Sequence, residues 1–563
     1  MRVIYFFLLT TILLITVSCT QDDPAADKGR LETATYDATS QTFTLTYQSG
    51  YTITVQAVVD NSVTPPAASA TLDDGTIVSV SDANVSGDAT VTTPDVVSDN
   101  QYVNGWIYDQ MSIYYLWNDK LSRSPDYSLY PADFFDSILY KYNEVTAPDG
   151  DRFSWIQEDY AELLNDLRGV SSDEIGFEYV FAWADQAQTY FYALVLYPKH
   201  GTDAEAKGIS RGRFVTKIDG QDITPQNYES LFGGTGTKTL SMADWVYYPE
   251  ESTYYLQDSG EVTIQMHHNY AENPVYEDSV YIINDQKIGY LVYHFFSPDQ
   301  GDSSYDYDQQ LMNRLDAMKT QGVNEMVLDL RYNSGGAVSS AIALASALVK
   351  DRSTGNVFTL SEYNDIIHTE LLKEFGENYN KDYFIDKVYD TEISIPAMNL
   401  PRLYVLTSGW TASASELVIN GLKPYMDVFL IGETTYGKNV GSISIYEEND
   451  PRNKWGMQPI VVKYFNREGK SDFTAGFTPD YQIDEFAELF LYDFGDTNDP
   501  LLGSAIELIT GVPTTSATRA LRPSTPFRSS RVDKKATLHM QERDRFDMHD
   551  DVRGDDIKKL MKK

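Results

Sequence analysis

The chain has 563 residues, of which 42% are hydrophobic, so it is long enough for several domains with buried cores. Its formal net charge is −39, with 83 acidic against 44 basic residues. Such a surface repels phosphate backbones and anionic lipid headgroups, so nucleic acid and acidic membrane surfaces are not expected partners.

Residues 1–18 have the pattern of a secretory signal peptide. Arg2 precedes the apolar run VIYFFLLTTILLITVS, which is short for a membrane span. Cys19 follows the run and is the only cysteine, so no disulfide can form within the chain. The sequence ITVSC resembles a bacterial lipobox, although Thr16 stands where that pattern prefers leucine. The resemblance predicts a lipid on Cys19, and the alternative is an ordinary signal peptide followed by a chance cysteine.

The residues after Cys19, TQDD, resemble the acidic signals that send some Bacteroidetes lipoproteins to the cell surface. We therefore expect a secreted, Bacteroidetes-like lipoprotein of the cell envelope. Its lipid would anchor it in the outer membrane, on the periplasmic or the cell-surface side. Residues 19–40 would form the linker behind this anchor.

Two small modules are expected next. In residues 41–59, QTFTLTYQSGYTITVQAVV, apolar and polar residues alternate on both sides of the turn QSG, which predicts a hairpin. This hairpin belongs to a small β module over 41–97, in which we identify no chemistry. Residues 98–167 include IYDQMSIYYLW and YPADFFDSILYKYNEV, whose helical spacing predicts a helical segment.

Residues 168–240 resemble a PDZ domain. The stretch GTDAEAKGISRGRFVTKIDGQDIT has the short helix, glycine turns and strand of the second half of that fold, with Arg213 where aspartate is common. PDZ domains hold the terminal carboxylate of a peptide with backbone N–H groups. The resemblance places Ile175, Gly176 and Phe177 of EIGF in that peptide-binding loop. The plainer alternative is a β-hairpin region with glycine turns.

From residue 285 the pattern is α/β. Strands are predicted at KIGYLVYHFF, EMVLDL, LPRLYVLTS and DVFLIGE, and helices lie between them, apart from a polar and aromatic insertion at 351–396. Strands that alternate with helices indicate a parallel sheet. Functional groups of such sheets gather at the carboxyl ends of the strands.

Two of the predicted strand-to-helix turns carry residues suited to acyl transfer. Gly335 and Gly336 follow EMVLDL, and Ser413 and Ala414 follow LYVL. Turns at helix N-termini present free backbone N–H groups, which bind anions. If the two strands are neighbours, these N–H groups can hold an oxyanion beside Ser413. The alternative is that Ser413 is a helix N-cap, with Glu416 completing a capping box.

Lys438 follows the strand VFLIG and is flanked by turn residues. A lysine accepts a proton only in its neutral form, and burial away from water favours that form. No histidine lies between 369 and 538, and His294 is interpreted as a structural residue on its strand. Lys438 is therefore the candidate base for Ser413.

The motifs DLRYNSGG, TSGWTASASELV, IGETTYGK and GFTPD, after a PDZ-like segment, resemble the carboxy-terminal processing (tail-specific) serine peptidases. The resemblance covers about 165–485 and implies a multidomain α/β protein with a ClpP/crotonase-like core at 241–510. It also implies Ser413 as the nucleophile, Lys438 as the base, and Gly335, Gly336 and Ala414 as oxyanion donors. No cofactor or metal is implied.

One position departs from the family pattern. The family often has a glutamine four residues after the lysine, helping to orient it, and this chain has Ser442 there. We expect protein or peptide substrates gathered by their C-termini. A catalytically weak or inactive peptide-binding lipoprotein is the main alternative, and acyl-thioester chemistry on a crotonase-like core is another. The sequence does not specify an oligomeric state.

Residues 511–563 form a basic tail, with 13 Lys and Arg against 8 Asp and Glu. The tail is rich in Ser, Thr, Pro and Arg and is predicted to be disordered. Its last stretch, DDIKKLMKK, is compatible with one or two helical turns. A basic tail can fold back on an acidic body, but a solvated tail is the first expectation.

Overall fold

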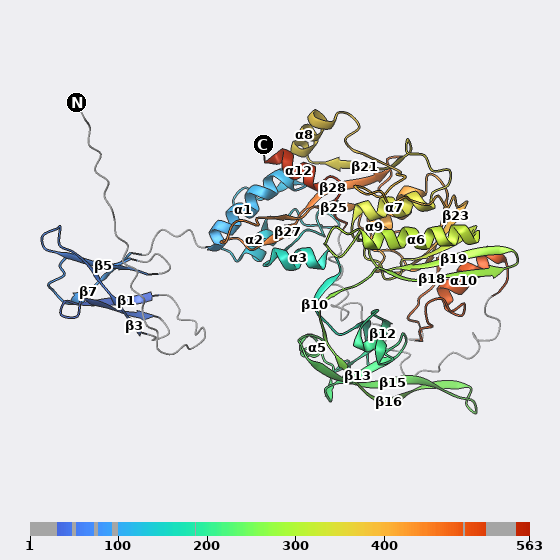
Figure 1. Cartoon of the computed structure of the whole chain (residues 1–563), viewed down its shortest axis with the longest axis horizontal. Helices are drawn as coiled ribbons and strands as arrows, with labels where there is room; N and C mark the ends of the chain where they lie inside the picture. Colours follow the sequence, from blue (N-terminus) through green and yellow to red (C-terminus); the bar gives the residue numbers. More distant parts are fainter. Residues whose placement is uncertain are drawn as a thin grey trace. The chain divides into compact units, whose positions relative to one another are not determined.

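The structure, a computed structural model of the full chain, describes residues 31–47, 52–72, 77–92, 99–185, 187–487, 490–513 and 548–562. The chain divides into two units, Met1–Asp99 and Asn100–Lys563 (Figure 1). The predicted signal peptide and Cys19 lie outside the described residues. Within the described ranges, no helix combines the length and the apolar character needed to cross a membrane.

The first unit contains two antiparallel four-stranded sheets, ordered β3-β2-β1-β7 and β4-β5-β6-β8. The strands are β1 Leu31–Asp37, β2 Thr42–Tyr47, β3 Thr52–Gln56, β4 Val58–Asp60, β5 Ala67–Thr71, β6 Ile77–Val80, β7 Gly87–Asp88 and β8 Thr90–Thr92. β2 and β3 form the predicted hairpin, and Phe43 and Leu45 are buried while Thr44 between them is exposed. The module begins earlier than predicted, because β1 pairs with β2 from within the segment assigned to the linker.

A six-stranded sheet, ordered β18-β19-β20-β23-β24-β29, is the centre of the second unit. Its strands are β18 Val275–Ile283, β19 Gln286–Tyr293, β20 Glu325–Asp329, β23 Arg402–Thr407, β24 Asp427–Gly432 and β29 Tyr481–Gln482. All run parallel except β18, which is antiparallel to β19. The predicted parallel sheet is confirmed, and β20 and β23 are neighbours within it.

Four helices pack on the two faces of this sheet (Figure 1). They are α6 Asp306–Gln321, α7 Val338–Leu348, α9 Ala414–Leu422 and α10 Pro500–Thr510. Successive side chains of a strand point to opposite faces. Leu328 and Val405 accordingly pack with α6, α7 and α9, whereas Val327 and Leu406 pack with α10. Both helices that follow β20 and β23, α7 and α9, therefore begin at the same edge of the sheet.

Asp308 is a fully buried carboxyl group on α6. Burial raises its pKa from 3.8 to about 7. The unfolded chain therefore loses this proton at lower pH than the folded chain. The free energy of unfolding should fall as the pH rises from about 4 to about 7, by up to about 4 kcal/mol from this group. Asp308→Asn, which cannot ionise, is expected to lose less stability than wild type between pH 4 and pH 8 in urea unfolding. Equal losses in the two proteins would contradict the assignment.

The segment expected to resemble a PDZ domain, called the PDZ-like module below, forms a module that is longer than predicted. Its sheet is ordered β11-β12-β13-β15-β16, with β14 beside β13, and β10 pairs separately with β17. The elements are β10 Val170–Glu174, β11 Phe177–Trp183, β12 Phe191–Pro198, α4 Asp203–Ala206, β13 Phe214–Ile218, β14 Gln221–Asp222, α5 Tyr228–Phe232, β15 Thr237–Tyr248, β16 Thr253–Gln265 and β17 His267–Ala271. The predicted boundary at 240 falls inside β15, because β15 and β16 form one long hairpin, visible as the lowest ribbon in Figure 1.

Residues 99–167 contain helices, but loops and a strand make up the rest of this segment, and it packs on the remainder of the second unit. They form α1 Asp99–Tyr114, the 3-10 turn η1 Asn118–Lys120, α2 Pro131–Ile138, β9 Trp155–Gln157 and α3 Tyr160–Asp166. Phe134 joins the apolar cluster of the central sheet, and the Leu116 N–H donates to the Ile460 carbonyl at 2.8 Å. β9 pairs with β27 Gly456–Gln458, which also pairs with β26 Ile445–Tyr446.

The insertion 351–396 is folded. It forms β21 Val357–Tyr363, α8 Asp365–Phe375 and β22 Lys381–Tyr383. β21 and β22 join β25 Val440–Ser442 and β28 Ile460–Asn466 in a second sheet, ordered β22-β21-β28-β25.

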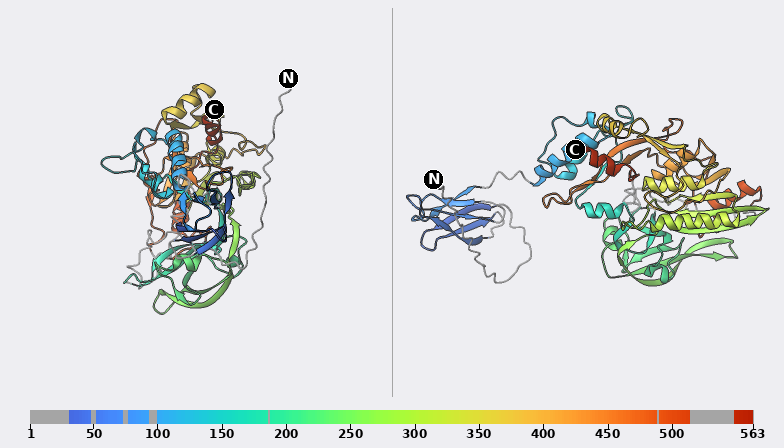
Figure 2. Two further views of the ribbon diagram at one scale, coloured as in Figure 1. Left: turned by 90° about the vertical axis from the view of Figure 1, so that its left-hand side faces the viewer. Right: turned by 45° about the horizontal axis from the view of Figure 1, so that its top comes forward.

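The C-terminal segment 548–562 differs from the prediction of a disordered tail. It contains the helix α12 Gly554–Met561, which both views place beside α8 (Figures 1 and 2). Met548 and Ile557 are fully buried in the core cluster of the second unit. The prediction rested on the composition of the whole tail, which is low in apolar residues. This overall composition did not reveal that a short stretch near its end has apolar residues that pack on the rest of the unit. Residues 514–547 lie outside the described residues.

Candidate active site

Two turns meet where the neighbouring strands β20 and β23 end. Residues 330–337 lead into α7, and residues 408–413 lead into α9. The Ala412 N–H donates to the Asn333 carbonyl at 3.1 Å, and the Ser415 hydroxyl donates to the same carbonyl at 3.1 Å. The two turns that sequence analysis selected are therefore bonded to each other.

Ser413 is held in a strained backbone conformation. Its φ is 62° and its ψ is −114° at the N-cap of α9. An ordinary N-cap residue has β-region angles, and a non-glycine residue outside the allowed regions costs about 1–3 kcal/mol. The residue is fully buried, and its Oγ accepts a hydrogen bond from the Met548 N–H at 2.7 Å. Ser413 thus occupies the cap position of the alternative interpretation and forms the predicted capping box with Glu416, but its strained backbone is not that of an ordinary cap.

Glu416 connects the serine turn with the lysine loop. Its Oε2 accepts from the backbone N–H of Ser413 at 3.0 Å and from that of Lys438 at 2.7 Å. Its Oε1 accepts from the Thr435 hydroxyl at 2.5 Å and from the Gly437 N–H at 2.8 Å. Burial raises the pKa of this carboxyl, and the four hydrogen bonds oppose the rise. One carboxyl group therefore holds both predicted catalytic residues by their backbones.

Lys438 is buried in the loop between β24 and β25, with 2% of its surface exposed. Its Nζ lies 4.8 Å from the centre of the Phe153 ring. The neighbouring Arg152 donates to the carbonyls of Gly437 at 2.7 Å and Thr474 at 2.9 Å. Arg152 and Phe153 therefore contact the lysine loop, a role that sequence analysis did not assign to the segment that contains them.

Gly335 and Gly336 both have left-handed φ angles, 117° and 132°. A Cβ at Gly336 would lie 2.0 Å from the Phe296 carbonyl oxygen, so only glycine fits. The Gly335 N–H donates to Asn333 Oδ1 at 2.9 Å. Within the described ranges, by contrast, no acceptor is present for the N–H of Gly336 or of Ala414. These two N–H groups are the ones available to bind an oxyanion.

Ser442, predicted to orient the lysine, is fully buried at the end of β25. Its N–H donates to the Met548 carbonyl and its carbonyl accepts from the Asp550 N–H, both at 2.9 Å. These contacts connect Ser442 with the C-terminal segment, and its orienting role stays a prediction.

The predicted peptide-binding loop, residues 174–177, is buried within its own module. Ile175 and Phe177 belong to the apolar cluster of that module. The Gly176 N–H donates to Glu174 Oε1 at 2.9 Å, and Glu174 forms a buried ion pair with Lys199. A peptide carboxylate would compete with Glu174 for this N–H, so peptide binding by the loop stays a prediction.

His294 lies just after β19, between Tyr293 and Phe296, whose backbones bond to the turn at 330–337. Its ring is 3.9 Å from that of Tyr197 and 4.7 Å from that of Tyr276, measured between centroids. Its Nδ1 is 3.5 Å from Glu272 Oε1. These aromatic and acidic neighbours join the PDZ-like module to the central sheet, which supports the interpretation of His294 as structural.

A buried ionic network fixes the turn at 330–337. Arg331 bonds to Asp329, to Glu485 at 2.6 Å and to Asp499 at 2.9 Å, and Arg211 of the PDZ-like module pairs with the same Glu485. Removal of one partner from a buried ion pair lowers the stability of the fold strongly, so we interpret this network as structural. Among the described residues, no group of three or more His, Cys, Asp or Glu side chains is placed to hold a metal ion. Catalysis without a cofactor stays a prediction.

Comparisons with known proteins identify the same region. The family model described as "Peptidase family S41" matches residues 287–483, and that described as "Peptidase S41 N-terminal domain" matches residues 102–155. The second match falls in the helical segment that contributes Arg152 and Phe153 to the site.

Two curated relatives are carboxyl-terminal processing proteases. That of Picosynechococcus is 29% identical over 48% of this chain and 55% of its own length. CtpA of Bacillus subtilis is 23% identical over 67% of this chain and 72% of its own length. The chain thus spans about half the length of the first of these relatives. A crystal structure of a proposed S41 protease from Bacteroides fragilis matches with a TM-score of 0.59 and 29% identity, over 72% of this chain and 97% of the other.

Proposed function

The chain belongs to peptidase family S41, and we propose that it is a serine endopeptidase that uses a Ser413–Lys438 dyad. The observation that carries the proposal is the double contact of Glu416 Oε2 with the backbone N–H groups of Ser413 and Lys438. It supports a common site for a nucleophile and a base that lie 25 positions apart in the sequence.

In the proposed reaction, the neutral amine of Lys438 takes the proton of the Ser413 hydroxyl while Oγ adds to the carbonyl carbon of a peptide bond. The tetrahedral intermediate collapses, the C–N bond breaks, and the lysine returns the proton to the leaving amine. Water then hydrolyses the acyl-enzyme with the same base. The backbone contact with Glu416 and the burial of Lys438 beside the Phe153 ring support this role, because both hold the lysine in one place.

The oxyanion is proposed to bind the N–H groups of Gly336 and Ala414. Gly335 was a further candidate, but its N–H already donates to Asn333. The N–H of Gly336 lies in the turn that leads into α7, and the N–H of Ala414 lies at the start of α9, next to Ser413. A donor pair fixed by the backbone costs little reorganisation when charge develops on the substrate oxygen.

Substrates are proposed to be proteins gathered by their C-termini through the PDZ-like module. β11 is the edge strand of its sheet, and an edge strand can accept an extended peptide as an added strand. The two curated relatives are named carboxyl-terminal processing proteases, and these names support recognition of substrates by their C-termini. The contact of Gly176 with Glu174 implies that peptide binding there displaces a carboxylate of the chain itself.

The direct test is incubation of the purified chain with a fluorogenic unfolded protein, with Ser413→Ala as the inactive reference. Hydrolysis above that reference supports the peptidase. Binding of peptides without hydrolysis would instead favour the peptide-binding lipoprotein, which is the alternative function.

Glu416→Gln tests whether Glu416 positions Ser413 and Lys438 for catalysis or only stabilises the fold. The amide keeps one acceptor oxygen but cannot accept all four hydrogen bonds, so Ser413 and Lys438 lose their common partner. We expect kcat to fall by about 10- to 100-fold with little change in KM, because small misplacements of reacting groups carry costs of this size. Steady-state kinetics provide the measurement, and Ser415→Ala, which removes a different hydrogen bond of the same turn, is the control. A change confined to KM would contradict the positioning role.

The envelope location and the lipid on Cys19 are also proposed. They are supported by the lone cysteine that ends the apolar run. Metabolic labelling with a fatty-acid analogue should mark the wild-type chain and not Cys19→Ala. Label on both proteins would contradict the lipobox, and fractionation of labelled cells would then locate the chain.

A further inference from the structure

The C-terminal segment of the chain lies in the candidate active site. The backbone N–H of Met548 donates to Ser413 Oγ at 2.7 Å, and Met548 is fully buried. The segment therefore contacts the atom to which the proposed function assigns nucleophilic attack.

The segment pairs as a strand on both of its sides. On one side, the His549 N–H donates to the Gly336 carbonyl and the Val338 N–H donates to the His549 carbonyl, both at 3.2 Å. On the other side, Ser442 exchanges two hydrogen bonds of 2.9 Å with Met548 and Asp550. Both pairings are parallel. This is the way in which an extended peptide adds to free strand edges, so a substrate strand that reached Ser413 here would need the same partners.

Two acidic side chains fasten the strand next to the site. The Asp551 carboxylate accepts from the Ser339 N–H at 2.9 Å and from the Ser339 hydroxyl, at the first turn of α7. The Asp550 carboxylate accepts from the Tyr363 hydroxyl at 3.0 Å. A carboxylate at a helix N-terminus is favourably placed in the field of the helix.

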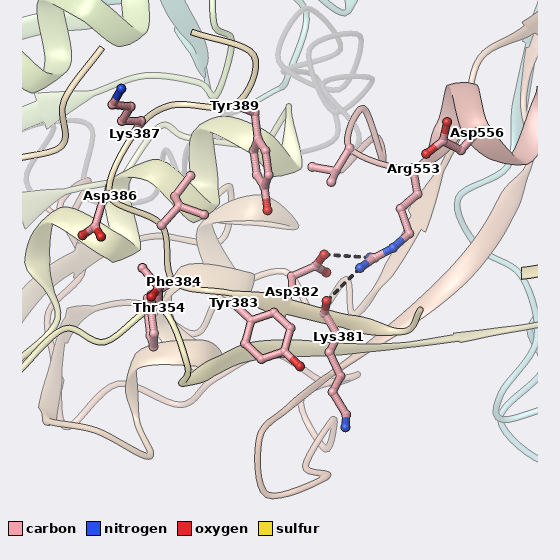
Figure 3. Close-up of a pocket in the computed structure, with 12 residues that line it drawn as sticks. Thr354, Lys381, Asp382, Tyr383, Phe384, Asp386, Lys387, Tyr389, Arg553 and Asp556 are labelled. Carbon is pink, nitrogen blue, oxygen red and sulfur yellow. Dashed lines mark hydrogen bonds and ion pairs between the residues drawn. The ribbon is translucent and has the colours of Figure 1, made fainter. Parts of the chain in front are cut away.

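A second anchor lies further from the nucleophile. Arg553 pairs with Asp382 at 2.7 Å and donates to the Lys381 carbonyl at 2.9 Å, as Figure 3 shows beside a cavity of about 550 Å³. Asp382 is buried, and an unpaired charge there would be costly. α12 follows, with Ile557 fully buried. This anchor belongs to no part of the proposed catalytic machinery, so it can be altered separately.

The geometry at Ser413 is that of an inhibitor and not that of a substrate. A peptide N–H lies in the plane of its peptide group. Because the Met548 N–H points at Oγ, the serine lies at the edge of that group. Attack requires Oγ to approach the face of a carbonyl carbon in a near-attack arrangement.

We propose that residues 548–562 are a built-in inhibitor that occupies the substrate strand position next to Ser413. The inference rests on the proposed function and adds its regulation. Because the segment belongs to the same chain, it competes with substrate at an effective concentration on the order of 1 mM. Substrates must displace it, so weakening its anchor should raise activity.

The test uses the full chain with Arg553→Glu, which turns the contact with Asp382 into a repulsion. Its matched control is Lys559→Glu, the same type of charge reversal at an exposed residue of α12. Hydrolysis of a fluorogenic unfolded protein should rise about tenfold or more in Arg553→Glu and stay at the wild-type rate in Lys559→Glu. A synthetic peptide of residues 548–563 should inhibit Arg553→Glu, and the same peptide with glutamate at position 553 should inhibit it much less.

Ser413→Ala gives the background rate of the assay. Comparison with it distinguishes failure of the proposed peptidase function from failure of the proposed inhibitor. If wild type and Arg553→Glu both match Ser413→Ala, the peptidase function itself is wrong. If both exceed it equally, with native circular dichroism and no inhibition by the peptide, the inhibitor is wrong and the peptidase stands. Mass spectrometry of purified wild type should show the intact C-terminus. A Ser413-dependent loss of residues 548–563 would overturn the proposal, because the segment would then be a substrate.

Discussion

Ser413→Ala is expected to abolish peptide hydrolysis, whereas Ser415→Ala should retain most of it. The two serines are two positions apart and both are fully buried, but their hydroxyl groups have different environments. Ser413 Oγ lies at the strained N-cap of α9, where the two turns meet. Ser415 Oγ is bonded to the Asn333 carbonyl, which also accepts from Ala412. Loss of the nucleophile should reduce kcat by about 10⁴-fold or more. Loss of the Ser415 hydrogen bond should cost about 1 kcal/mol of stability.

The two serine variants are measured with a fluorogenic unfolded protein, in the wild-type chain and in the Arg553→Glu chain. The Arg553→Glu chain is included because its higher expected rate of hydrolysis makes a loss of activity measurable even if the wild-type chain is slow. Circular dichroism and thermal unfolding of each variant distinguish a lost nucleophile from a lost fold. Equal losses from the two substitutions, or activity that survives Ser413→Ala, would remove Ser413 from its role.

The sheet and its turns were predictable because their signals are local. The apolar run EMVLDL, followed by glycines and then an alanine-rich helix, is a strand, a turn and a helix whatever surrounds it. The same holds for LYVL and the helix after Ser413. Parallel packing of such units brings their turns to one edge, so the meeting of the turn before α7 with the turn before α9 follows from the order of elements. The structure confirms this adjacency through the pairing of β20 with β23.

What sequence analysis missed depends on contacts between distant segments. Glu416 has the spacing of a capping box, and this spacing does not reveal that its carboxylate also bonds to the Lys438 N–H. Phe153 reaches Lys438 from the helical segment, to which no chemistry had been assigned. The docking of the C-terminal segment was not predicted, because the tail as a whole has a composition typical of disorder, although its last residues were compatible with a helix. In each case the partner is specified by the fold, and local periodicity contains no information about it.

The serine prediction tests the nucleophile alone, and the base needs a test of its own. Lys438 donates its backbone N–H to the same carboxylate as Ser413, and the Phe153 ring covers its side chain. A change at Lys438 that spares the backbone should therefore leave the turn intact. His294, the other residue considered as a base, lies among aromatic rings at the PDZ-like module.

Lys438→Arg and Lys438→Met should both be inactive, with losses of about 10³-fold or more in kcat. Arginine keeps the charge, but its guanidinium stays protonated at any working pH and cannot take the proton of Ser413. Methionine keeps the approximate length and removes the basic nitrogen. The two variants therefore fail for the same chemical reason, the lack of a group that can accept the proton, although only arginine keeps the charge. His294→Gln should retain most activity, because that ring packs against Tyr197 and Tyr276 in the contact between the PDZ-like module and the central sheet. The measurement is hydrolysis in the Arg553→Glu chain, with circular dichroism for each variant. An active Lys438→Arg together with an inactive, folded His294→Gln would make histidine the base, and the dyad would give way to a histidine-dependent hydrolase on the same fold.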